Sequence, residues 1–65
     1  MKEAIEALKV GEAWQSPERI VVERRSEFAY VIWDMVIDRC VIVPDSRRAA
    51  VMVQLIQEGD YWNEA

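Results

Sequence analysis

The sequence has 65 residues, of which 52% are hydrophobic and 31% are charged, and its formal net charge is −4. This composition is typical of a globular protein rather than a disordered segment, and the length allows one domain at most. One cysteine and no histidine exclude an intrachain disulfide and the common zinc-binding patterns. A fold this small buries only about 60% of the surface of its unfolded chain, so it needs an efficient core or self-association.

The cysteine content and the apolar runs also predict where the protein resides. A single cysteine fits a reducing compartment. No apolar run approaches the roughly 20 residues that span a membrane, and residues 1–10 carry acids where a signal peptide would be apolar. We therefore expect a soluble cytoplasmic protein without a cofactor or a metal.

Charge is unevenly distributed along the chain. Residues 1–18 carry two lysines and four glutamates, residues 49–65 carry three acids and no base, and residues 19–48 carry six arginines and five acids. Generic nucleic-acid binding requires a basic surface. The acidic ends therefore argue against nucleic acid as the partner.

The first predicted element is a short amphipathic helix over residues 2–10. Met1, Ile5 and Leu8 fall on one stripe, and Gly11 is placed to end the helix. A helix of nine residues is not stable alone in water, so this one is expected to dock on the rest of the fold.

A connector and a first strand are predicted next. Ser16 and Pro17 are typical of a turn, and Trp14 is a large apolar anchor just before them. Residues 19–25 are rich in β-branched side chains, which predicts a strand.

Two further strands are predicted at residues 28–36 and 40–44, after turns at residues 26–27 and 37–39, and Pro44 ends the last one. The faces of the first of these would carry Phe28, Tyr30, Ile32 and Asp34 on one side, and Ala29, Val31, Trp33 and Met35 on the other. Apolar residues on both faces are typical of a central strand that is covered on each side.

A second helix is predicted after the third strand. Asp45 or Ser46 can cap its start, and Gly59 can end it. Its apolar residues occupy an arc of roughly 200°, whereas covering one side of a small sheet takes roughly 100° or a little more. Val51 and Leu55 lie at the edge of this excess arc.

Together these elements predict that residues 1–65 form a single small α+β domain. It would contain a short N-terminal helix, a three-stranded antiparallel β-meander and a C-terminal helix packed on the sheet. Two explanations of the excess arc remain open. Either the N-terminal helix or the tail with Tyr61 and Trp62 folds over Val51 and Leu55, or this patch is a docking surface for a second copy or another protein.

The C-terminal residues combine aromatic and acidic side chains. The candidates for partner binding are Glu58, Asp60, Tyr61, Trp62 and Glu64, together with Val51 and Leu55. Tyr and Trp are enriched in binding hot spots, and an acidic rim steers a protein toward a basic partner. The alternative is that Trp62 packs back on the sheet while the acids stay solvated.

Two arginine doublets are the basic features of the chain, Arg24-Arg25 and Arg47-Arg48. The second doublet falls in the first turn of the predicted helix, where free N–H groups favour anions, so Arg47 and Arg48 are candidates for an anion site. Otherwise the arginines face water or pair with neighbouring acids such as Glu23, Glu27 and Asp45.

The sequence contains no catalytic constellation. Cys40 lies in an apolar strand with no histidine or lysine nearby to activate it, so a buried structural cysteine is expected. Asp34 and Asp38 could form a carboxylate pair, but they straddle a predicted turn. Without a histidine, an activated nucleophile or a glycine-rich phosphate loop, the sequence predicts that the protein is not an enzyme.

Four features of the sequence carry a resemblance to a known class of proteins. They are the length, the acidic ends, the missing catalytic residues, and the run YVIWDMVIDRCVIVPDSRRAA at residues 30–50. In these features the chain resembles the small acidic proteins that phages and other mobile elements encode to disable bacterial defences, including anti-CRISPR proteins. The arginines of residues 19–48 depart from that pattern. The resemblance implies binding to the nucleic-acid-handling surface of a larger complex, with carboxylates in place of phosphates. These would be Glu3, Glu6, Glu12, Glu58, Asp60 and Glu64.

Three hypotheses for function follow. The first is an inhibitor or adaptor that binds another protein stoichiometrically through its acidic ends. The second is a homodimer in which Val51, Leu55 and the open sheet face meet their copies across a two-fold axis. The third is a regulator that binds anions or nucleic acid through its doublets, Arg24, Arg25, Arg47 and Arg48.

Overall fold

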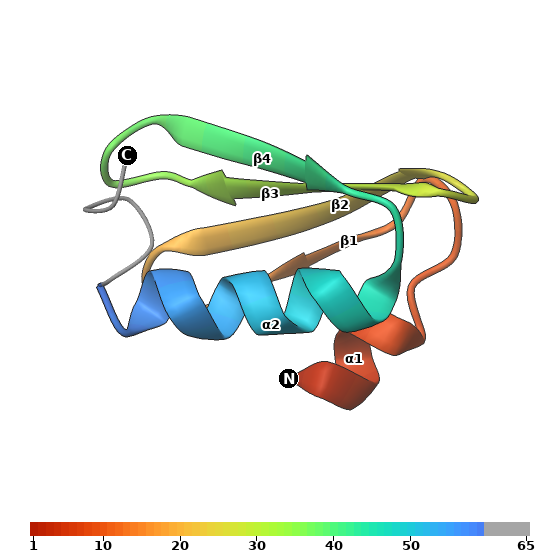
Figure 1. Ribbon diagram of the computed structural model, residues 1–65, viewed down its shortest axis with the longest axis horizontal. Coiled ribbons are helices and arrows are strands. Elements are labelled where there is room, and N and C mark those ends of the chain that lie inside the picture. Colours follow the sequence, from red (N-terminus) through yellow and green to blue (C-terminus); the bar gives the residue numbers. More distant parts are fainter. Residues whose placement is uncertain (60–65) are drawn as a thin grey trace.

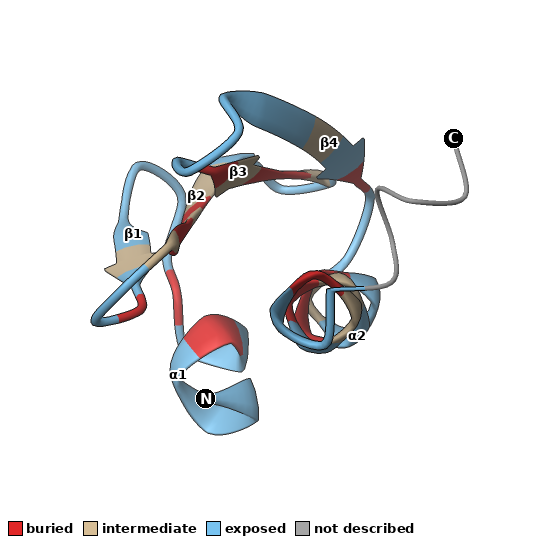
Figure 2. Cartoon of the chain, turned by 90° about the vertical axis from the view of Figure 1, so that its left-hand side faces the viewer, coloured by how far each residue is buried: buried red, intermediate tan, exposed pale blue. Residues whose placement is uncertain are grey.

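The computed structural model describes residues 1–59, which form two layers, a four-stranded antiparallel sheet and a pair of helices (Figures 1 and 2). In chain order the elements are α1 (Lys2–Glu6), β1 (Ala13–Gln15), β2 (Ile20–Ser26), β3 (Ala29–Asp34), β4 (Arg39–Val43) and α2 (Ser46–Gln57). Neighbouring strands follow the chain, so the sheet is a meander in the order β1-β2-β3-β4. The α+β class, the antiparallel sheet and the two helices are as predicted.

The prediction of three strands is wrong, because the expected connector contains β1. Its three residues pair with β2 in antiparallel register, and Trp14 packs against the core. So short a strand does not show the alternation that identifies strands in a sequence. The turn that follows is as predicted, since the Ser16 hydroxyl accepts hydrogen bonds from the N–H groups of Arg19 and Ile20, at 3.1 and 2.8 Å.

The hydrophobic core lies between the sheet and the two helices, and Figure 2 shows buried segments in the sheet and in both helices. Every element except β1 contributes fully buried or nearly buried side chains, and Leu8 follows α1. The core residues are Ile5, Leu8, Ile20, Val22, Tyr30, Ile32, Val43, Ala49, Ala50, Val53 and Ile56.

Helix α2 begins and ends as predicted. The Asp45 carboxylate caps it by accepting a hydrogen bond from the N–H of Arg48 at 2.8 Å. Gly59 follows the helix with φ = 84°, the left-handed conformation that glycine adopts without steric cost.

Helix α1 is shorter than the predicted helix over residues 2–10. Ile5 and Leu8 join the core as expected, but Met1 is exposed, and the segment leaves the helix well before Gly11. Arg24 holds this segment against the sheet, because its guanidinium donates a hydrogen bond to the Leu8 carbonyl at 2.7 Å. The N–H of Gly11 in turn donates a hydrogen bond to the Arg24 carbonyl at 2.8 Å. These two hydrogen bonds to β2 take the place of the helical hydrogen bonds that were predicted for residues 7–10.

The two turns flanking β3 differ from the prediction. Phe28 is an exposed turn residue between β2 and β3, not part of a strand. At the other end β3 stops at Asp34, and the turn to β4 takes Asp38 into the left-handed region at φ = 55°. Aspartate tolerates this conformation better than most residues do, so the turn forms without a glycine.

One carboxylate is buried at the end of the sheet. Asp34 is fully buried, and its Oδ2 accepts hydrogen bonds from Nη2 and Nε of Arg19, at 2.6 and 2.8 Å. Its Oδ1 accepts a third from the N–H of Val36 at 3.0 Å. The hydrogen bond to Asp34 raises the pKa of Arg19 above its ordinary value. Asp34 therefore ties the start of β2 to the end of β3, while Asp38 lies exposed in the turn.

Candidate functional site

Both helices lie on the same side of the sheet, and the opposite side, here called the open face, is uncovered by any described element (Figure 2). The strand register fixes which side chains it carries, since alternate residues of a strand point to opposite faces. The residues of the open face are Ala13, Gln15, Val21, Glu23, Ser26, Ala29, Val31, Trp33, Cys40 and Ile42. Arg25, at a register shift in β2, joins them through its ion pair with Glu23.

The open face is apolar over its centre. Val31 is only 1% exposed, yet it is not part of the core, so its own neighbours on the open face bury it. Beside it Trp33 is half-buried and Ile42 is 62% exposed. An antiparallel sheet with one face in water normally presents polar residues on that face. The centre of this face instead carries the apolar side chains of Val31, Trp33 and Ile42.

The apolar surface continues past the end of β3. Met35, in the turn to β4, is 61% exposed. Val21, Trp33 and Met35 line a shallow hollow whose remaining walls are Glu23 and Asp38. The open face thus has relief into which a side chain of another molecule can fit.

The charges within the strands of the open face cancel. Nε of Arg25 lies 2.6 Å from Oε1 of Glu23, which makes an ion pair on one strand. The face is therefore neutral across its strands, although the whole chain carries a net charge of −4.

The expectation of a buried Cys40 is wrong. The thiol is exposed, because β4 is an edge strand and Cys40 points to the side that the helices do not cover. The apolar sequence around Cys40 predicted burial, but apolar neighbours in the sequence do not determine which face of the strand is covered. The candidates for partner binding that were predicted from the sequence include none of the residues of the open face.

The excess apolar arc of α2 is only partly covered. Met52 and Leu55 are half-buried, while Val51 is 52% exposed. Helix α1 packs beside the first half of α2 without covering Val51, so the first explanation fails for this helix (Figure 1). Val51 borders an apolar groove between β4 and α2, formed with Val43, Arg47, Arg48 and Met52.

Within residues 1–59, the structure does not gather the predicted acidic residues on one surface. Glu3 and Glu6 are in α1, and the Glu12 carboxylate accepts a hydrogen bond from the N–H of Lys9 at 2.7 Å. Glu58 follows the last turn of α2, at the end of that helix away from α1 (Figure 1). The other predicted partner-binding residues, Asp60, Tyr61, Trp62 and Glu64, lie outside the described residues.

The arginine doublets make mostly internal contacts. Arg25 pairs with Glu23, and Nε of Arg48 lies 3.6 Å from Oδ2 of Asp45, as predicted. Arg24 instead donates to backbone carbonyls and lies 5.3 Å from the centre of the Tyr30 ring. Arg47 is exposed at the groove beside α2.

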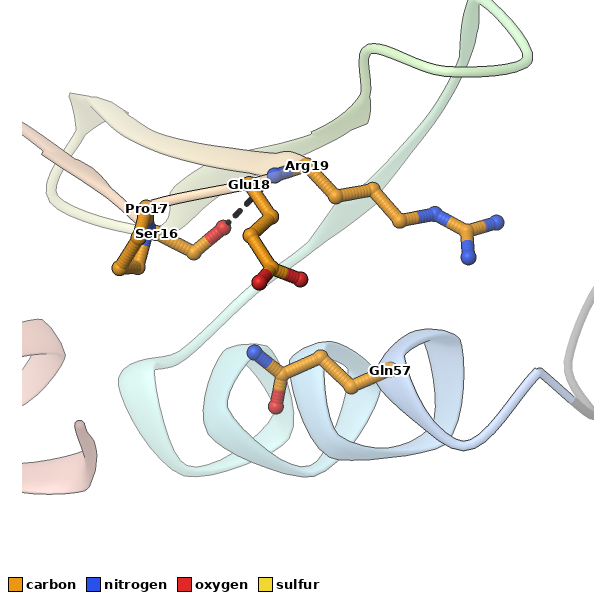
Figure 3. Close-up of a pocket in the computed structure, with 5 residues that line it drawn as sticks. All are labelled: Ser16, Pro17, Glu18, Arg19 and Gln57. Carbon is orange, nitrogen blue, oxygen red and sulfur yellow. Dashed lines mark hydrogen bonds between the residues drawn. The ribbon is translucent and has the colours of Figure 1, made fainter.

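A second, polar pocket lies between the β1–β2 turn and the end of α2 (Figure 3). Its volume is about 380 Å³, and Ser16, Pro17, Glu18, Arg19 and Gln57 line it. The Ser16 hydroxyl is occupied by the turn, and the Arg19 guanidinium by a buried carboxylate. This leaves one carboxylate and one amide, which do not assemble an acid–base pair or an activated nucleophile.

Membrane-spanning helices and metal-binding groups are both absent from the described residues. Within residues 1–59, neither helix has the length and apolar character needed to cross a lipid bilayer. The same residues contain no group of three or more cysteine or carboxylate side chains placed to hold a metal ion.

No protein-family model matches this sequence, and no curated protein or solved structure matches it either. The surface of the molecule is therefore the basis for a functional proposal.

Proposed function

We propose that this protein works by stoichiometric binding to another protein molecule and that the open face is its docking surface. The single observation that supports this is the apolar centre of a sheet face that no described element covers. Contiguous apolar surface of this kind on a small protein marks interaction sites, because leaving it in water is unfavourable.

Covering the exposed apolar side chains of this face contributes favourably to association. Burying a whole isoleucine or methionine side chain contributes about 1.5–3 kcal/mol. Ile42 and Met35 still expose 62% and 61% of their surface, so covering each contributes about 1–2 kcal/mol. Trp33 and Cys40 add to this area. A partner that covers the open face gains from all four side chains together.

The inhibitor interpretation places the contact elsewhere, on the acidic ends. Glu3 supports it, since its side chain is almost fully exposed. The other described acids do not extend that surface, because Glu12 is used locally and Glu58 lies at the far end of α2. The open face is therefore the stronger basis for binding, whatever the identity of the partner.

Sedimentation of a fluorescently labelled chain in cell extract tests the proposal. Ile42→Lys places a charge on the open face, and Val51→Lys is a matched control with similar exposure on α2. We expect the wild type and Val51→Lys to sediment faster than a free chain of 7.6 kDa, and Ile42→Lys to sediment as that free chain. Circular dichroism confirms that both variants fold.

The label is attached at the N-terminus, because a label on Cys40 would lie on the open face. A wild-type chain that sediments as a free monomer, both in extract and when pure and concentrated, would overturn the proposal. So would a complex that Ile42→Lys leaves intact and Val51→Lys disrupts, because it would move the docking surface to α2.

A further inference from the structure

We infer that the partner of the open face is the same face of a second copy of this chain. The inference rests on the proposed function and names the molecule that the surface binds. Two chains would pack sheet against sheet across a two-fold axis, with their helices on the outside.

The charge of the open face favours a second copy over a charged partner. A basic protein would be matched by an acidic face and a nucleic acid by a basic one, but Glu23 and Arg25 neutralise each other here. A two-fold axis brings identical surfaces together, so like charges concentrated on this face would repel. The chain carries most of its net charge elsewhere, which leaves the strands of this face free of that repulsion. The exposed Asp38 lies at the hollow beside the strands, and the two copies would have to hold their Asp38 side chains apart.

The size of the open face agrees with a dimer interface. A specific interface of standard size takes about 800 Å² from each partner. That is under a fifth of the 4411 Å² accessible surface of this chain. One broad face of a body measuring 30 × 22 × 18 Å supplies about that fraction of its surface. Almost the whole open face would be used, including Trp33 of β3 and Ile42 of β4.

The packing would turn the two-layer fold into four layers, helices outside and two sheets inside. Stacked sheets lie about 10 Å apart, a distance that side chains from both faces fill by interdigitating. Ile42 and Trp33 are exposed enough to interdigitate with the second sheet, whereas Val31 is already buried within the single chain. The dimer would bury Cys40, which is exposed in the single chain.

The molar mass in solution is the first test. Light scattering on a dilution series should give twice 7.6 kDa at high concentration, falling toward 7.6 kDa on dilution. Ile42→Lys buries a charge without a partner in the interface, so it should raise the dissociation constant of the dimer at least about tenfold. Val51→Lys should leave the dissociation constant unchanged.

The reactivity of Cys40 is the second test, and it reports on the open face alone because the chain has no other cysteine. The observed rate constant for its reaction with a soluble disulfide reagent should halve when the protein concentration equals the dissociation constant. It should fall about tenfold at roughly 50 times that concentration, since buried thiols are inert. In Ile42→Lys the rate constant should stay high at the same concentrations.

The outcomes separate this inference from the proposed function. A dimer whose Cys40 stays reactive would use another surface, such as the free edge of β4, and would refute the inference. A chain that is monomeric at every concentration would also refute it. If that monomer still forms an Ile42-dependent complex in extract, the open face binds a different protein and the proposed function stands.

Discussion

Replacing Asp34 tests whether the buried carboxylate holds the end of the sheet together. Asp34 is fully buried, and it accepts hydrogen bonds from Arg19 and from the N–H of Val36. Asp34→Ala removes every acceptor at once, whereas Asp34→Asn keeps an oxygen that can still accept from Val36. The two variants therefore divide the contribution of the charge from that of the backbone contact.

The expected cost can be estimated from what each variant leaves unpaired. A buried donor without its acceptor costs about 1–3 kcal/mol, and a lost buried methylene-sized contact costs about 0.8 kcal/mol. For Asp34→Ala this gives about 2 kcal/mol, from the lost packing and from the N–H of Val36, which counts at the low end because its contact is only part-buried. We count nothing for Arg19, whose guanidinium reaches water. For Asp34→Asn the acceptor remains, and about 1 kcal/mol is expected.

Urea unfolding followed by circular dichroism measures both values, at one fixed protein concentration because self-association adds to stability. A domain of this size has a total stability of about 3–10 kcal/mol, so Asp34→Ala should unfold at a markedly lower urea concentration than the wild type. The raised pKa of Arg19 adds no pH dependence at neutral or moderately alkaline pH, since its contribution is lost only when strongly alkaline solution deprotonates the guanidinium. A cost below about 1 kcal/mol for Asp34→Ala would refute the reasoning, as would equal costs for both variants.

Four further predictions concern local structure and charge. Asp45→Ala should cost about 1 kcal/mol in urea unfolding, because it removes the cap of α2. Gly11→Ala should cost about 1–2 kcal/mol through its φ of 92° alone, since no other atom lies within 4 Å of the added carbon; a neutral result would contradict the left-handed conformation. Ile56→Ala should cost about 2–5 kcal/mol and Val51→Ala under about 1 kcal/mol, because only Ile56 is fully buried. If the acidic ends carry the contact with a partner, affinity should fall steeply with added salt, and an affinity that stays constant would exclude them.

The elements that the sequence predicted best are those with local signals. Asp45 and Gly59 define both ends of α2 through contacts within one turn, so a short window of sequence contains the information. The turn before β4 was misplaced for the opposite reason: Asp38 adopts a conformation that a sequence normally signals with glycine. β1 was missed because three residues acquire strand geometry only by pairing with β2.

The candidate site depended on information that no window of sequence holds. The pattern of β3 correctly indicated apolar residues on both faces, but which face is covered depends on where the helices dock. Cys40 was expected to be buried because its strand is apolar, and it is exposed because β4 lies at an edge with its outer side uncovered. Apolar sequence shows that a surface needs cover, whereas only the tertiary fold shows whether the chain provides it.

The topology explains why one face stays open. Only Pro44 and Asp45 separate β4 from α2, so the helix must turn back directly across the sheet, and the small side chains of Ala49 and Ala50 let it pack closely there. Helix α1, with five residues, fills the remaining space on the same side and joins the same core. Two helices of this length cover one face of a four-stranded sheet and no more. The apolar surplus of α2 therefore remains on the helix as the exposed Val51, and a separate apolar surface lies on the opposite side of the sheet. Only another molecule or a segment outside residues 1–59 can cover that second surface.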